Sequence, residues 1–129
     1  MIYEKASNHT FFIDHFRDGD TVEGFITCRC CGQTHHDVVR VLAVESWEPK
    51  GSTRVRATTT AQALTALYRG QSGLLIPANI RRDRYHRVLA DVLFGNISLA
   101  QLLVRDGFAW YGVGEPEPTT TPFVASDAG

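Results

Sequence analysis

Several features are absent from this sequence, and each absence excludes a class of protein. No apolar run approaches the length of a membrane-spanning helix, and residues 1–5 lack a basic region followed by an apolar one. The formal net charge is only −1, so a strongly basic body is excluded and any affinity for polyanions must come from a local patch. These absences favour an intracellular protein without a membrane anchor. A secreted form that has lost its leader is the alternative.

Cysteine is also scarce, and its few copies are crowded together. Cys28, Cys30 and Cys31 have no partner cluster elsewhere in the chain, which argues against a disulfide framework and favours a reducing compartment. The Cys28-x-x-Cys31 spacing resembles a zinc knuckle, and His35 could supply a third ligand. A tetrahedral zinc site needs a fourth ligand, and the alternative is a hairpin tip without metal. The sequence leaves both interpretations open.

The remaining composition is that of an ordinary globular domain. The 129 residues are 43% hydrophobic and 21% charged, which suits one domain with a real core. We expect residues 1–112 to form this domain, as a monomer. Residues 113–129 are rich in proline, threonine and acidic side chains and have little to bury, so we expect a loosely ordered tail.

Runs of β-branched and aromatic residues, bounded by turn residues, predict a set of strands. Pro77 cannot donate a hydrogen bond to a neighbouring strand, so the run around it is predicted as an edge or irregular strand. The strands are predicted at residues 10–16, 21–28, 38–49, 73–80 and 88–94.

Two capping boxes followed by apolar residues at helical spacing predict two helices. The first begins at Thr59 and ends at Gly70, and the second begins at Ser98 and ends at Gly107. Residues 50–56, before the first helix, are polar and basic and are predicted as a loop. The apolar faces of both helices are expected to pack on the core.

The strand predicted at residues 38–49 carries charged residues that suit a functional site. Arg40 interrupts an apolar run, and a buried guanidinium needs an anionic partner such as a phosphate or a carboxylate. Glu45 and Glu48 follow at the end of the strand. These residues indicate either a site with an anion-binding group and a base, or a structural ion pair between arginine and glutamate.

Two further segments carry candidate binding residues. Residues 81–87 place four arginines around Tyr85, an arrangement that suits a phosphodiester backbone and a stacked base, although a solvated charged loop is the alternative. Asp18 and Asp20 flank a glycine at a junction between strands. Asp18 is expected to serve the turn itself, and Asp20 is the better candidate for a hard divalent cation together with Glu45.

Four short motifs occur in a fixed order between residues 10 and 111. Each motif alone is weak, but their order and spacing together resemble the staphylococcal nuclease-like (thermonuclease) family. The resemblance implies an α+β fold, a five-stranded OB-fold β-barrel with helices packed on it. The motifs are Asp18-Gly19-Asp20-Thr21, then Val39-Arg40-Val41 leading to Glu48-Pro49, then Asp83-Arg84-Tyr85-His86-Arg87-Val88-Leu89-Ala90, and finally Leu103-Val104-Arg105-Asp106-Gly107-Phe108-Ala109.

The resemblance also implies a calcium-dependent nuclease that hydrolyses DNA, RNA or both with little sequence preference. Its calcium ligands would be Asp20, Glu45 and the backbone oxygen of Ser46. Arg40 and Arg87 would hold the phosphate, and Glu48 would be the base or orienting group for the attacking water. Tyr85 would contact the substrate beside the phosphate, with Arg84 and Tyr111 as further substrate contacts.

The sequence departs from the family pattern at several positions. Glu45 stands where the family usually has aspartate, Trp47 where it usually has proline, and His86 where it usually has glycine. The rival interpretation is a non-catalytic OB-fold module that binds nucleic acid or a protein partner. Such modules typically lose the set of arginines and carboxylates, so the presence of Arg40, Glu48 and Arg87 favours the nuclease. A third interpretation is a structural protein stabilised by zinc in the cysteine loop.

Overall fold

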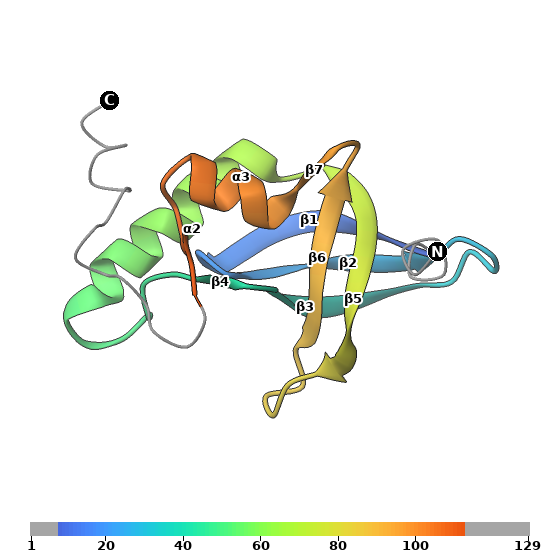
Figure 1. Ribbon diagram of the computed structural model, residues 1–129, viewed down its shortest axis with the longest axis horizontal. Helices are drawn as coiled ribbons and strands as arrows, with labels where there is room; N and C mark the ends of the chain where they lie inside the picture. The colour runs from blue at the N-terminus through green and yellow to red at the C-terminus, as the bar shows by residue number, and fades with distance from the viewer. Residues whose placement is uncertain (1–7, 113–129) are drawn as a thin grey trace.

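The computed structural model describes residues 8–112, and its main feature is a sheet that closes on itself. The strand order is β3-β2-β1-β5-β6-β7, and an additional parallel pairing between β3 and β6 closes a five-stranded barrel (Figure 1). This architecture confirms the expected OB-fold barrel with two helices. The strands are β1 (His9–Asp18), β2 (Thr21–Cys28), β3 (Thr34–Val41), β4 (Val44–Glu45), β5 (Ser72–Arg82), β6 (Val88–Phe94), β7 (Ile97–Ser98) and β8 (Trp110–Tyr111).

The barrel strands bury alternate side chains, as a half-buried sheet requires. In β1, Phe11 and Ile13 are fully buried while Phe12 between them is exposed. The buried residues from the five barrel strands meet apolar residues of the two helices in one core. The largest fully buried side chains in this core are Phe11, Ile13, Val22, Val39, Val41, Val44, Leu64, Val92, Leu99 and Leu103.

Both helices lie on the same side of the barrel (Figure 1). The second, α3 (Leu99–Arg105), begins with the predicted capping box, in which Ser98 and Gln101 exchange side-chain hydrogen bonds with each other's backbone N–H groups. No helix within residues 8–112 is long and apolar enough to cross a membrane. The expected tail at residues 113–129 lies outside the described residues.

The first helix starts earlier than the sequence predicts. A short 3₁₀ helix, η1 (Gly51–Thr53), leads directly into α2 (Arg54–Tyr68), so the loop predicted at residues 50–56 is wrong. Tertiary contacts explain the difference, because Ala57 is buried and the guanidinium of Arg56 lies 5.0 Å from the centre of the Trp47 ring. These contacts extend the helix N-terminally beyond the capping-box residues.

The strand predicted at residues 38–49 is also interrupted. Strand β3 ends at Val41, a turn follows, and only two residues form β4. Ala43 in this turn has a positive φ of 67°, a conformation that a residue other than glycine rarely adopts. Arg40 stabilises the turn, because its Nη1 donates hydrogen bonds to the carbonyl oxygens of Val41 at 2.6 Å and Val44 at 2.8 Å. The break turns the segment that carries Glu45 and Glu48 away from the barrel wall.

Candidate active site

A polar cleft of about 520 Å³ lies where four segments of the chain meet. The segments are the β1–β2 turn, the end of β3, the stretch from β4 to residue 49, and the loop at residues 83–87. Eight of the site residues proposed from the sequence line this one cleft. They are Asp20, Arg40, Glu45, Ser46, Glu48, Arg84, Tyr85 and Arg87, and the other lining residues are Arg17, Asp18, Trp47 and Pro49.

The two arginines reach the cleft because β3 and β6 are paired in parallel. Arg40 is paired with Leu89, and Arg87 is the residue just before β6, so both arginines lie along the seam between the C-terminal half of β3 and the start of β6. Thr21 links the two sides, since it is the pairing partner of Arg40 and its hydroxyl accepts a hydrogen bond from Arg87 Nη1 at 3.1 Å. The side chains of Arg40 and Arg87 are 18% and 26% exposed, so each guanidinium is partly desolvated yet accessible to an anion.

Two acidic residues of the cleft, Asp20 and Glu45, approach Arg40. Its Nη2 lies 3.5 Å from Asp20 Oδ2 and 3.3 Å from Glu45 Oε1, so carboxylates from two separate segments point to one position. An all-oxygen donor set of this kind suits a hard divalent cation such as calcium, which would complete its shell with water and phosphate oxygens. Among residues 8–112, no three His, Cys, Asp or Glu side chains are already arranged around a metal position.

Asp18 is a cleft residue that the sequence interpretation assigned only to the turn. Its Oδ1 accepts a hydrogen bond from the backbone N–H of Asp20 at 3.1 Å, which is the expected turn contact. The side chain is also buried against Asp20. This burial, followed by the effect of the neighbouring Asp20 carboxyl, raises the pKa of Asp18 to about 7. Two crowded carboxyl groups at one edge of the cleft favour a cation there.

The loop at residues 83–87 is organised by Asp83, to which the sequence interpretation gave no role. Asp83 Oδ1 accepts hydrogen bonds from the backbone N–H groups of Tyr85 and Arg87, both at 2.9 Å, and Oδ2 accepts one from Arg87 Nε at 2.7 Å. Burial opposes ionisation, but these hydrogen bonds hold the pKa of Asp83 below its usual value. Asp83 therefore fixes the orientation of the Arg87 guanidinium.

Tyr85 projects from this loop toward solvent and is 62% exposed. The guanidinium carbons of Arg84 and Arg87 lie 5.0 Å and 5.2 Å from the centre of its ring, so the ring is held beside the arginines of the cleft. His86 has a positive φ of 67°, which explains why glycine suits this position in the family pattern.

The segment after β4 contributes one buried residue, Ser46, and one exposed side chain, that of Glu48. Ser46 is buried, and its hydroxyl donates a hydrogen bond to the carbonyl oxygen of Phe108 at 2.8 Å. A Cβ atom on Gly19 would lie only 1.9 Å from Ser46 Oγ, so glycine is required where the β1–β2 turn packs on this segment. Glu48 is different, since its side chain is 70% exposed and its nearest charged partner is Lys50 Nζ at 3.8 Å.

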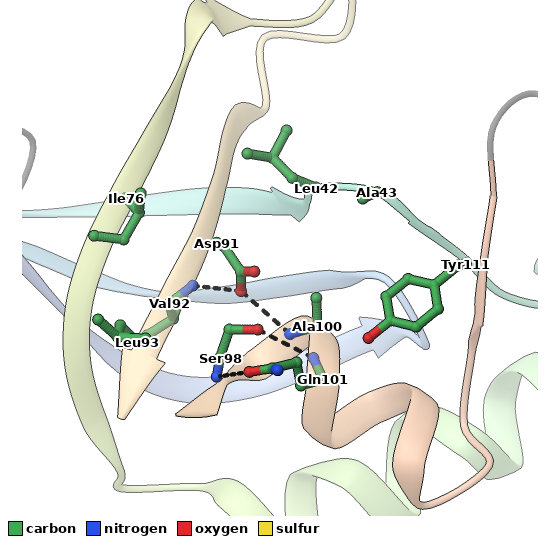
Figure 2. Close-up of a pocket in the computed structure, with 10 residues that line it drawn as sticks. All are labelled: Leu42, Ala43, Ile76, Asp91, Val92, Leu93, Ser98, Ala100, Gln101 and Tyr111. Atoms are coloured by element: carbon green, nitrogen blue, oxygen red, sulfur yellow. Dashed lines mark hydrogen bonds between the residues drawn. The ribbon is translucent and has the colours of Figure 1, made fainter. Parts of the chain in front are cut away.

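Tyr111, the remaining substrate contact proposed from the sequence, lies apart from the cleft. It lines a separate, mostly apolar pocket of about 320 Å³, together with Leu42, Ile76 and Asp91 (Figure 2). The pairing of β4 with β8 explains its position, because alternation along β8 sends Trp110 into the core and leaves Tyr111 exposed. Asp91 at the wall of that pocket is held by the backbone N–H groups of Val92 and Ala100.

The proposed zinc ligands are not gathered either. His35 lies in β3 with its Nε2 3.0 Å from Asp37 Oδ2, and the pocket that it lines contains none of the cysteines. Cys28 and Cys30 are close to each other, with 3.3 Å between their sulfur atoms, at the tip of the β2–β3 hairpin. The geometry within residues 8–112 therefore provides neighbouring thiols there but no ready set of zinc ligands.

These thiols should differ in reactivity. Hydrogen bonds from Cys31 and then Cys30 lower the pKa of the Cys28 thiol to about 7. The hydrogen bond with Cys28 has the opposite effect on Cys30 and raises the pKa of the Cys30 thiol. Because only the thiolate reacts, Cys28 should be alkylated first by iodoacetamide, with a rate that rises to its half-maximum near pH 7. Peptide mass spectrometry after brief alkylation, from about pH 6 to about pH 9, measures this order. Faster labelling of Cys30 than of Cys28 at neutral pH would contradict this order. Cys30→Ala should slow the labelling of Cys28 at neutral pH, because it removes one of the hydrogen bonds that lower the pKa of Cys28.

Comparison with known proteins places this geometry in a family. The family model described as staphylococcal nuclease homologue matches residues 39–125, more than half of the 129 residues. The matched segment contains Arg40, Glu45, Glu48 and Arg87, while Asp20 precedes it. A search of curated proteins gives no significant match.

Proposed function

This chain belongs to the staphylococcal nuclease homologue family, and from that membership we propose that it is a nuclease that hydrolyses phosphodiester bonds of DNA, RNA or both. The proposal includes calcium dependence and little sequence preference. The observation that carries it is the convergence of Arg40, Arg87 and Glu48 on one cleft from three separate segments of the chain. None of the three is locked in a closed ion pair with the other two.

The two arginines would bind the scissile phosphate. Guanidinium groups suit phosphate oxygens because they present several N–H donors in a planar fork. In-line attack on phosphorus increases the charge on the equatorial oxygens, and donors that are fixed beforehand stabilise that charge most effectively. Asp83 fixes Arg87, and the turn carbonyls of Val41 and Val44 fix Arg40. Both groups would therefore need little reorganisation during the reaction.

Glu48 would accept the proton of the attacking water. A carboxylate can do so if it reaches hydrogen-bond distance of that water, and Glu48 is exposed at the cleft without a strong partner. Tyr85 and Arg84 at the opposite wall would contact the nucleotide next to the cleaved bond.

Asp20 and Glu45 are the residues that would hold calcium, with oxygen ligands from Ser46 and water. When bound, calcium would neutralise charge on a phosphate oxygen. Arg40 Nη2 lies between these two carboxylates, while its Nη1 is held by the turn carbonyls, so the residues that would hold the cation and the arginine that would bind the phosphate are neighbours. Glu45 is one methylene longer than the aspartate that is usual at this position, so its carboxylate would reach the calcium from a longer side chain.

The direct test is digestion of single-stranded DNA and of RNA in calcium, magnesium and chelator. We expect cleavage of at least one polymer in calcium and its loss in chelator, with recovery when calcium is restored. An Arg87→Ala protein, purified in parallel, controls for contaminating nucleases. Binding of the polymer without cleavage under all conditions would instead support the non-catalytic OB-fold module. Cleavage that persists in chelator would disprove the calcium requirement.

A further inference from the structure

The outer face of β1, β2 and β3 carries side chains in regular rows that begin at the candidate cleft. Directly paired residues on antiparallel strands project to the same side of a sheet. The row nearest the cleft contains Asp18, Thr21 and Arg40. The next contains His15, Glu23 and Val38, the third contains Phe12, Phe25 and His36, and the fourth contains Thr10, Thr27 and Thr34.

The third of these rows, here called the aromatic row, is unusual for a surface. Phe12 and Phe25 are 41% and 38% exposed, although phenylalanine normally lies inside. The rings of Phe12 and Phe25 have their centres 6.4 Å apart, and those of Phe25 and His36 are 5.4 Å apart in an edge-on arrangement. Three aromatic rings thus lie side by side across three strands and open to solvent.

We infer that the aromatic row is a second binding site, where an unpaired base of a polynucleotide stacks while a phosphate a few nucleotides further along the same strand lies in the cleft. This inference rests on the proposed function for the identity of the ligand. Aromatic rings on a barrel wall are sequence-tolerant platforms for bases, because every base has a flat face. The bases of a duplex are already stacked on one another, so the site would select single-stranded DNA or RNA.

The distance between the two sites fits this occupant. His36 and Arg40 are four residues apart on β3, which corresponds to about 13 Å at 3.3 Å per residue. A strand with stacked bases advances about 3.4 Å per nucleotide, so about four nucleotides span the gap and fewer are needed if the strand is extended.

The charges between the two sites also permit the passage of a phosphate backbone. Two acidic residues lie along this path, and both are paired. Glu23, in the row between the two sites, contacts Arg17, His15 and His36, and Asp14, at the bulge of β1, contacts His15 and Arg69. Arg17 pairs with Glu23 and also lines the cleft, so its positive charge lies between the cleft and the aromatic row. Two exposed phenylalanines are too small a patch for a stable protein interface, which buries about 800 Å² on each partner, but they suffice for a base.

The test compares how the wild type and variants of the aromatic row bind one single-stranded oligonucleotide. Binding of a fluorescein-labelled single strand of oligodeoxythymidine is measured by fluorescence anisotropy in chelator, where no cleavage occurs. The double variant Phe12→Ala/Phe25→Ala should bind this strand about tenfold more weakly, the loss expected for one stacked base. Leu67→Ala is the control, because Leu67 is also an exposed apolar side chain, 55% exposed on α2, but lies outside the outer face, and the variant should bind like the wild type.

Conservative variants and a kinetic comparison separate stacking from a structural role. Phe25→Tyr should retain affinity because it keeps the ring, whereas Phe25→Leu and His36→Ala should weaken it. In calcium, the double variant should lose about tenfold more kcat/KM on the long strand than on a dinucleotide, which is too short to reach the aromatic row. The loss should appear as a higher KM. Unchanged affinity of the double variant, or an equal loss of affinity for duplex and single strand, would overturn the inference. Because binding is measured without cleavage, an inactive protein that still binds through these rings would refute only the proposed function.

Discussion

Arg87→Ala should reduce turnover about a thousandfold while the protein stays folded. Asp83 and Thr21 hold the guanidinium of Arg87 in place, and under the proposed function its removal takes away phosphate-binding donors aimed at the charge that develops in the reaction. The side chain is 26% exposed and lies on a loop, so the free energy of unfolding should fall by only about 1 kcal/mol. Single-turnover cleavage of an oligonucleotide and thermal unfolding measure the two quantities.

Arg40→Ala provides an informative contrast at the other guanidinium. Arg40 donates to the carbonyl oxygens of Val41 and Val44 and lies between two carboxylates, so its removal leaves several partly buried groups without a partner. We expect this variant to lose activity and also about 3 kcal/mol of stability. An Arg87→Ala protein that unfolds as readily as Arg40→Ala, or that keeps wild-type turnover, would contradict the separation of roles proposed here.

Glu48→Gln should reduce kcat by about two to four orders of magnitude without weakening substrate binding. The amide cannot take a proton from water, yet it has the same shape as the carboxylate. Because 70% of the Glu48 side chain is exposed and only Lys50 approaches it, the melting temperature should not change. Steady-state kinetics on a short oligonucleotide give kcat and KM separately.

The matched control for this variant is Glu23→Gln, which removes a carboxylate of the same length outside the cleft. Glu23 contacts Arg17, His15 and His36, none of which is proposed to touch the reacting groups. Glu23→Gln should therefore leave kcat within about twofold of the wild type, and any effect through His36 of the aromatic row should appear in KM. Equal losses of kcat in both variants would show that Glu48 acts through net charge rather than as a base.

The barrel and most of the cleft were predicted through the resemblance of four short motifs to a known family, and such motifs report local backbone requirements. The Asp18-Gly19-Asp20 turn and the Ser98 capping box depend on nearby residues alone, and both are found where they were expected. The start of α2 and the break after Val41 depend on contacts with distant residues, such as Arg56 on Trp47. Local patterns cannot report such contacts, and both features were predicted wrongly.

Three site residues show the same limit. The position of Asp18 in its turn was clear, but its burial against Asp20 depends on how four segments meet. Asp83 was visible within its motif, yet its hydrogen bonds to Arg87 follow from the shape of the loop. Tyr111 lies at nearly the right spacing for a substrate contact, but the pairing of β8 with β4 places it at another pocket.

The parallel pairing of β3 with β6 has a consequence for how the protein is made. These strands are far apart in the chain, and contacts of this kind form slowly because a long loop must first be closed. Arg40 and Arg87 become neighbours only through that seam. A chain in which β6 has not yet paired with β3 therefore keeps the two arginines apart, so the proposed phosphate site becomes complete only at this late step of folding.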